Sequence, residues 1–149
     1  MTDLKKRLST IIESPENDTN VKLQKICHLL DQEIPYFNWT GFYFRNGDKE
    51  ELILGPYVGA ETDHTVIPFG KGICGQVAVS NETFVVPDVH EQDNYLSCSI
   101  DTKAEIVVPI IKEGKNIGQI DIDSHQLNPF TEEDRELLEW LCGEIAEIL

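Results

Sequence analysis

Apolar residues recur at helical spacing near both ends of the chain. In residues 2–13 they fall on one face of a helix, and in a segment that begins near residues 18–20 they recur at i, i+3, i+4 and i+7. Residues 132–148 show the same periodicity, and Thr131 precedes them as an N-cap with Asp134 three residues further on. The sequence therefore predicts two helices at the start of the chain and one at its end.

The middle of the chain alternates between short apolar or aromatic runs and turn residues. The runs predict six strands, over residues 38–45, 51–54, 64–69, 83–86, 106–111 and 116–123. Turn residues at 46–48 and 112–115 join neighbouring runs as hairpins. Helices at both ends with hairpin-linked strands between them predict an α+β fold, in which the helices cover one face of a mainly antiparallel sheet.

A glycine-rich loop interrupts the predicted strands. Residues 70–75 read Gly-Lys-Gly-Ile-Cys-Gly and match the pattern G-x-G-x-x-G, with Asp88 18 residues after Gly70. That pattern is typical of dinucleotide sites, but the helical stretch after it ends near residue 80 and the next strands form hairpins, not βαβ units. Two interpretations remain. The glycines serve a tight turn that needs positive φ, or the loop places Cys74 at the start of a helix, where free N–H groups favour a thiolate.

The four cysteines fall into two groups. Cys27 and Cys142 lie at apolar positions of predicted helices, which favours packing. Cys74 and Cys98 lie in loops, and Cys98 belongs to a long polar segment, residues 88–104. Two loop thiols suggest a redox pair, or a nucleophile with a resolving partner. A metal site between them is less well supported, because 24 residues separate them and there is no C-x-x-C.

Acidic residues gather on the last predicted hairpin. Asp121 and Asp123 alternate on one strand and so share a face, and Glu105 opens the preceding strand. Such a cluster suits a cation, for example an ammonium group, or a carboxyl whose pKa is raised by its like-charged neighbours. The alternatives are a solvated sheet face and a metal site completed by His125 and His90.

Composition limits the partners and the compartment. The chain has 149 residues, which fits one domain over 1–149, and 27 acidic against 12 basic residues give a net charge of −15. We do not expect it to bind nucleic acid or anionic membranes, which attract clustered Lys and Arg. The first 14 residues carry charges where a signal peptide would be apolar, and no apolar run approaches the ~20 residues of a membrane span. We therefore expect a cytoplasmic protein with reduced cysteines.

Several segments together resemble the free methionine-(R)-sulfoxide reductases, which are GAF-domain enzymes. The segments are residues 70–75, residues 86–90 (Val-Pro-Asp-Val-His), Cys98 with residues 105–109 (Glu-Ile-Val-Val-Pro), and residues 117–124 (Ile-Gly-Gln-Ile-Asp-Ile-Asp-Ser). The step of 24 residues from Cys74 to Cys98 and the further step of seven to Glu105 match the family. The resemblance extends from about residue 38 to the final helix.

This resemblance implies a GAF fold, with a six-stranded antiparallel sheet, terminal helices on one side and a small-molecule pocket on the other. It also implies a homodimeric enzyme that reduces free methionine-(R)-sulfoxide, is regenerated by thioredoxin, and has no bound cofactor or metal. Cys98 matches the catalytic thiol, and Glu105, Asp121 and Asp123 match the carboxylates around the substrate. An aromatic residue on the first strand is more often part of the core than of a site, but Trp39 matches a tryptophan of the pocket wall in the family.

Two departures from the family concern the thiols. The family has a third cysteine, often the resolving one, ten residues before the glycine-loop cysteine, where this chain has His64. Cys74 is then the remaining candidate for the resolving thiol. The family reads His-Ile-Ala-Cys-Asp around the nucleophile, whereas residues 95–99 read Tyr-Leu-Ser-Cys-Ser, which makes Ser97 and Ser99 candidate substrate contacts. These changes leave a second hypothesis, a GAF sensor or binding module that kept the acidic pocket and lost turnover.

Overall fold

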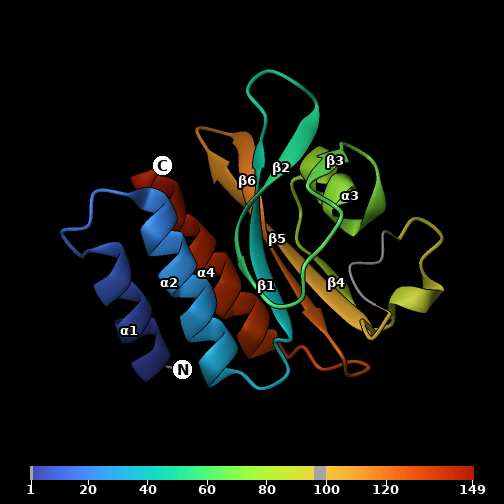
Figure 1. Cartoon of the computed structure of the whole chain (residues 1–149), viewed down its shortest axis with the longest axis horizontal. Helices are drawn as coiled ribbons and strands as arrows, with labels where there is room; N and C mark the ends of the chain where they lie inside the picture. The colour runs from blue at the N-terminus through green and yellow to red at the C-terminus, as the bar shows by residue number, and fades with distance from the viewer. Residues whose placement is uncertain (1, 96–99) are drawn as a thin grey trace.

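The computed structural model describes residues 2–95 and 100–149 (Figure 1). Its helices are α1 (Thr2–Ile12), α2 (Thr19–Glu33), α3 (Gly72–Ser80) and α4 (Glu132–Ile148), and a short 3-10 turn covers Val89–Glu91. Its strands are β1 (Trp39–Arg45), β2 (Glu51–Val58), β3 (Val66–Pro68), β4 (Phe84–Val86), β5 (Ala104–Lys112) and β6 (Lys115–Ser124). The predicted helices and all six predicted strands are confirmed, with shifts at their ends.

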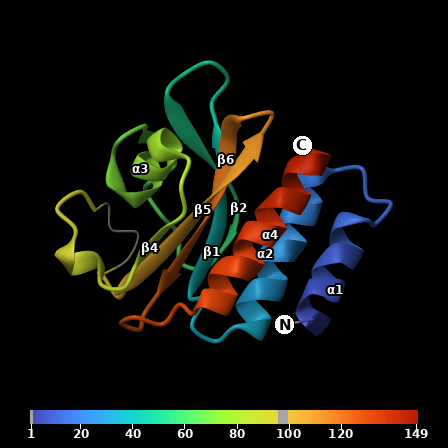
Figure 2. The ribbon, with the colours of Figure 1, turned by 180° about the vertical axis from the view of Figure 1, so that it is seen from behind.

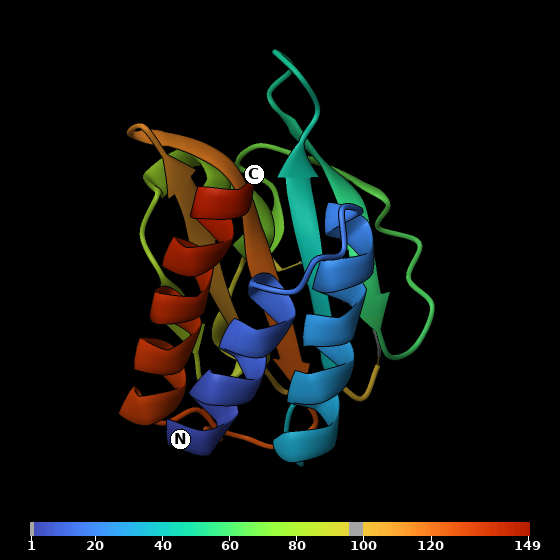
Figure 3. The same cartoon turned by 90° about the vertical axis from the view of Figure 1, so that its left-hand side faces the viewer.

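The strands form one antiparallel sheet in the order β3-β2-β1-β6-β5-β4. Helices α2 and α4 pack against one face, and α1 lies across both of them on the side away from the sheet (Figures 1 and 3). The short helix α3 covers part of the opposite face, as the view from behind also shows (Figure 2). The α+β fold with the terminal helices on one face is therefore confirmed.

The helix face carries the larger apolar core. Side chains of β1, β5 and β6 meet those of α2 and α4 there, and Cys27 and Cys142 are buried among them. Burial raises the pKa of both thiols well above the ordinary value, because a thiolate would lose its hydration. Each thiol lies near a backbone carbonyl, Cys27 Sγ at 3.6 Å from the oxygen of Pro56 and Cys142 Sγ at 3.7 Å from that of Val108. The prediction that these two cysteines pack in the core is confirmed.

The start of α4 is fixed by hydrogen bonds that the sequence predicted in part. Thr131 Oγ1 accepts from the backbone N–H of Asp134 at 3.1 Å, and Asp134 Oδ2 accepts from the N–H of Thr131 at 2.9 Å. The hydroxyl of Tyr36 donates to the same Asp134 oxygen at 2.6 Å. This third bond ties the connection between α2 and β1 to α4.

The strand β2 is longer than the sequence predicted. The sequence predicted a strand over residues 51–54, but β2 runs on to Val58. The pairing with β1 shifts between Gly41 and Tyr43, so Gly55 and Pro56 occupy a bulge where the missing N–H of proline is tolerated. A Cβ at Gly55 would lie 3.0 Å from the ring of Phe44, so a larger residue would have to displace that ring.

No helix among residues 2–95 and 100–149 is both long and apolar enough to span a bilayer. The prediction that the chain has no such span agrees with this for the described residues.

Candidate functional site

Three acidic side chains lie on the sheet face opposite the terminal helices. Glu105 of β5 pairs directly with Asp123 of β6, and Asp121 follows two positions away on the same face. Their exposed fractions are 3%, 1% and 0%, so the face is not solvated. Like charges directly opposite each other in a sheet are unfavourable. Burial adds a further free-energy cost, unless a bound cation or a proton neutralises part of the charge.

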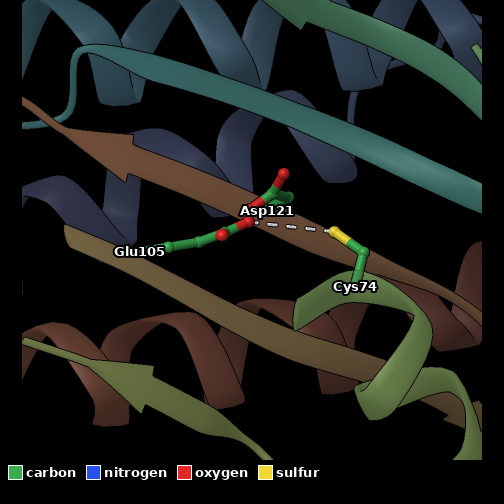
Figure 4. Close-up of side chains that lie close together, drawn as sticks. All are labelled: Cys74, Glu105 and Asp121. Atoms are coloured by element: carbon green, nitrogen blue, oxygen red, sulfur yellow. Dashed lines mark hydrogen bonds between the residues drawn. The ribbon is translucent and has the colours of Figure 1, made fainter. Parts of the chain in front are cut away.

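Cys74 approaches this cluster from α3. It is the third residue of the helix, since α3 begins at Gly72 inside the predicted loop, and its side chain is buried. Its sulfur lies 4.0 Å from Oε2 of Glu105 (Figure 4). The sulfur of Cys74 and one carboxyl oxygen each of Glu105 and Asp121 all lie within 4.8 Å of one another. The structure thus brings a nucleophilic thiol and two carboxyl groups from three elements to one point.

The glycines of the loop allow this approach. Gly70 and Gly72 have φ of 89° and 65°, which confirms the predicted need for positive φ. A Cβ at Gly75 would lie 2.7 Å from the backbone oxygen of Pro68, so the loop can fold back on itself only with glycine there. Gln119 of β6 then holds the helix in place, because its Nε2 donates to the carbonyl oxygen of Cys74 at 2.8 Å.

The environment of Asp121 favours its neutral form. Burial raises the pKa of this carboxyl above its ordinary value of 3.8, and the neighbouring Glu105 and Cys74 only partly oppose the shift. Neither carboxyl oxygen of Asp121 receives a hydrogen bond of ordinary geometry from a residue that the structure describes. A buried carboxyl of this kind can donate a proton to a ligand, or bind a cation that enters the site.

A small cavity lies over the cluster. Cys74, Glu105 and Asp121 line it together with the apolar side chains of Ile67 and Ile73. It is also lined by His64, Lys71 and Gly72. A cavity with an apolar wall and convergent polar groups is the usual form of a small-molecule site.

His64 reaches this cavity from the segment before β3. Its backbone oxygen accepts a hydrogen bond from the hydroxyl of Tyr43 at 2.8 Å, and Tyr43 is fully buried in β1 on the same sheet face. Sequence reasoning missed Tyr43 and Gln119 as supporting residues. The sequence could have indicated Gln119, because it precedes Asp121 by two positions and so lies on the same face of the strand. Tyr43 pairs with Gln119 across the sheet and therefore shares that face.

Trp39 lies on the correct face but is packed as a core residue. Its ring stacks on Tyr57 with centroids 5.3 Å apart, and its Nε1 donates to the oxygen of Ala60 at 2.9 Å. A Cβ at Gly41 or Gly59 would lie within 2.6 Å of the indole. Trp39 stands outside the set of described residues that line the cavity, so its role as a pocket wall stays a prediction.

The structure does not assemble the alternative metal site. His90 and His125 are exposed, and the backbone N–H of His125 donates to Asn38 Oδ1 at 2.8 Å beyond the end of β6. Among the described residues, the group that can offer three ligands to an ion is Cys74, Glu105 and Asp121. The alternative site of Asp121, Asp123, His125 and His90 is not formed, because β6 ends at Ser124, before His125.

Asn94 ties the polar segment after β4 to the glycine loop. Its Oδ1 accepts from the N–H of Gly72 at 2.9 Å, and its Nδ2 donates to the oxygen of Gly70 at 2.7 Å. Gln76 Nε2 also donates to the backbone oxygen of Asn94 at 3.2 Å. The chain is therefore held beside α3 four residues before Cys98 in the sequence.

Comparisons with known proteins agree with this arrangement. Residues 17–149 match the GAF domain family. The chain is 46% identical over 107 residues to the free methionine-R-sulfoxide reductase of Saccharomyces cerevisiae, a match that spans 70% of this chain and 59% of that protein. It is 35% identical over 121 residues to the enzyme of that name from Escherichia coli, over 81% of this chain and 72% of the other. The chain belongs to the free methionine-R-sulfoxide reductase family.

A crystal structure extends the likeness to three dimensions. The free methionine-R-sulfoxide reductase from Neisseria meningitidis, in complex with its substrate, superposes with a TM-score of 0.89 at 33% identity, over 97% of this chain and 87% of that one. The family assignment and the GAF fold predicted from the sequence are thus confirmed. The predicted nucleophile Cys98 and the predicted substrate contacts Ser97 and Ser99 lie outside the described residues. Their roles stay predictions.

Proposed function

We propose that this protein reduces free methionine-(R)-sulfoxide to methionine with its own thiols. The observation that carries the proposal is the buried group of Cys74, Glu105 and Asp121 under a small cavity, in a chain similar to free methionine-R-sulfoxide reductases. The substrate has a cationic ammonium group and a basic S=O oxygen. An ionised carboxylate of the site can pair with the ammonium group, and a neutral carboxyl can donate a hydrogen bond to the S=O oxygen.

The chemistry starts at Cys98. Its thiolate attacks the electrophilic sulfur and forms a bond between the two sulfur atoms, while a protonated carboxyl donates a proton to the sulfoxide oxygen. Asp121 is our candidate for that donor, because burial raises its pKa. Glu105 and Asp123 then bind the substrate ammonium, Trp39 covers the methyl group, and Ser97 and Ser99 orient the sulfoxide. The protonated oxygen then transfers to Cys98 Sγ as its bond to the substrate sulfur and the bond between the two sulfur atoms break, so that methionine leaves and Cys98 is a sulfenic acid.

Cys74 completes the cycle as the resolving thiol. Its sulfur attacks the sulfenic acid of Cys98, which releases water and leaves a disulfide. An external dithiol such as thioredoxin reduces that disulfide and becomes oxidised, so one dithiol is consumed for each methionine formed. No cofactor or metal takes part. We further propose a homodimer that works in the cytoplasm, where such reductants are available.

The assay that tests this function measures methionine released from free methionine-(R)-sulfoxide with dithiothreitol and with thioredoxin. Wild-type protein is expected to turn over with both, and Cys98→Ser to release none. Cys74→Ser should release one equivalent in a single turnover and then stall with thioredoxin. Cys142→Ala is the matched control, since that thiol is buried on the other face. No methionine from wild type, or equal turnover by Cys98→Ser, would contradict the proposal.

A binding module without turnover is the second candidate. It is favoured by His64, which lines the cavity at the position where the family has a third cysteine. Calorimetry with free methionine-(R)-sulfoxide separates the two functions. Binding without methionine release, in the presence of dithiothreitol, supports the module and excludes the reductase.

A further inference from the structure

The donor atoms above the acidic face come from three different elements. Cys74 lies in α3, Glu105 in β5 and Asp121 in β6, and all three side chains are buried. Figure 4 shows them pointing toward one another. Asp121 adds an independent observation, because this fully buried carboxyl lines the cavity and receives no hydrogen bond of ordinary geometry from the described residues. A site with such a group is incomplete without something that binds to it.

We propose that the reduced protein binds one thiophilic divalent cation, of which Zn²⁺ is the type, through Cys74 Sγ and one oxygen each of Glu105 and Asp121. The same ion then competes with the sulfoxide, a consequence that rests on the proposed function. The cation is an inhibitor here and takes no part in turnover. Binding replaces the thiol proton of Cys74 and any proton held between the two carboxyl groups, which pass to solvent.

The distances fit a tetrahedral ion after a small adjustment. Zinc binds sulfur at about 2.3 Å and oxygen at about 2.0 Å, so the two ligand atoms lie about 3.5 Å apart around the metal. Cys74 Sγ and Glu105 Oε2 are 4.0 Å apart, and the whole group spans no more than 4.8 Å. Side-chain rotations suffice to close this gap. The fourth position faces the cavity, where a water or His64 can complete the shell.

The composition of the site selects the ion. A thiolate ligand favours Zn²⁺, Cd²⁺ and Co²⁺ over Mg²⁺ and Ca²⁺, which prefer six or more oxygen ligands. Ile67 and Ile73 occupy part of the wall and leave little room for the water shell of a six-coordinate ion. The charge also fits, because a divalent cation offsets the buried carboxylates that otherwise repel each other.

Oxidation should abolish the site. Once Cys74 is part of a disulfide, its sulfur no longer carries the charge that binds the ion. Metal binding and disulfide formation therefore exclude each other, and the ion protects the reduced state.

The test is a metal titration of the reduced, chelator-stripped protein under argon. With Co²⁺, the wild type should show one equivalent of a sulfur-to-cobalt charge-transfer band in the near ultraviolet, which Zn²⁺ removes and a hundredfold excess of Mg²⁺ leaves unchanged. Cys74→Ser should lose the band and weaken Zn²⁺ binding at least about tenfold in competition with a chromophoric chelator. Glu105→Gln should weaken binding similarly while keeping the band, which covers the case in which Cys74→Ser misfolds.

Two matched controls remove thiols that are not part of the proposed ligand set. Cys142→Ala and Cys98→Ser should bind as the wild type does. A wild type that binds no Zn²⁺, or a folded Cys74→Ser protein that retains full affinity, would overturn the proposal, as would loss of the band in either control. Because the readout is spectroscopic, a protein that binds the ion but releases no methionine would contradict the proposed function and leave this inference standing.

Discussion

The two faces of the β5–β6 hairpin differ sharply although they alternate residue by residue. Toward the helices the hairpin presents Ile106, Ile120 and Ile122, all fully buried in an apolar core. Toward the cavity it presents Glu105, Asp121 and Asp123, which are buried equally well. The same backbone thus holds a stabilising face and a destabilising one. The apolar core under the helices therefore supplies the stability that lets the acidic side chains remain buried.

Removing a carboxylate on the cavity face should have the largest effect, on activity. Glu105→Gln keeps the shape and removes the charge that we assign to substrate binding, so kcat/KM should fall by about 10²–10³-fold, or about 3–4 kcal/mol. Methionine release in the thiol assay measures this. The matched control is Glu91→Gln, an exposed acid in the 3-10 turn. Unchanged activity in Glu105→Gln would remove this carboxyl from the site.

Truncating the helix face should mainly affect folding. Ile122→Ala removes a fully buried side chain from the larger core, so the free energy of unfolding should fall by about 2–4 kcal/mol. Urea denaturation followed by circular dichroism measures it. At temperatures where the variant is folded, its KM should stay near the wild-type value, and a KM raised as far as in Glu105→Gln would show that the faces are not separate.

Neutralising Asp121 should raise stability while it lowers activity. Because burial raises the pKa of Asp121 in the folded state above its ordinary 3.8, the folded protein loses stability as pH rises from that value toward the raised one. Asp121→Asn removes this loss, so its advantage over the wild type should be absent near pH 3.5 and grow as the pH rises toward 7. Thermal unfolding at several pH values with a chelator present measures it.

The control for this pH dependence is Asp93→Asn, an exposed carboxyl near the same side of the molecule. Its melting temperature should follow the wild type at each pH. An Asp121→Asn protein that is less stable than the wild type at pH 7 would show that the carboxylate is compensated in the free protein.

The smallest effect is expected at Asn94. Asn94→Ala removes two hydrogen bonds that hold the chain to Gly70 and Gly72, worth about 1 kcal/mol each at most at an exposed site. Disulfide formation after a single turnover should slow about three- to tenfold, while methionine release changes less. Rapid quench followed by thiol labelling separates the two steps. Equal slowing of both steps would instead mean that Asn94 acts on the site as a whole.

Periodicity and capping signals were sufficient to predict most of the fold. They gave the helices, the six strands, the cap at Thr131 and the inert role of Cys27 and Cys142, because each depends on neighbours in the sequence. The extension of β2 through Pro56 was missed, since it depends on a bulge against β1. The single domain over 1–149 stays a prediction.

The site was predictable only in its residue types. Alternation placed Asp121 and Asp123 on one face, but the meeting of Cys74 with Glu105 depends on the fold of the glycine loop and on sheet register. The bonds from Tyr43 to the backbone of His64 and from Gln119 to that of Cys74 join segments 21 and 45 residues apart, and no local pattern indicates them. Roles for Cys98, Ser97 and Ser99 remain predictions.

The central position of β6 has a consequence for how the chain avoids misfolding. A slip of one residue in its pairing with β5 would turn Asp121 and Asp123 into the helix core. The isoleucine side chains of β6 would then lie on the opposite face, beside Glu105. Neither face could then bury its new side chains at a tolerable free energy, because two carboxyl groups would stand among leucines. The acidic residues that we assign to substrate binding therefore also disfavour wrong strand registers during folding, whether or not a ligand is present.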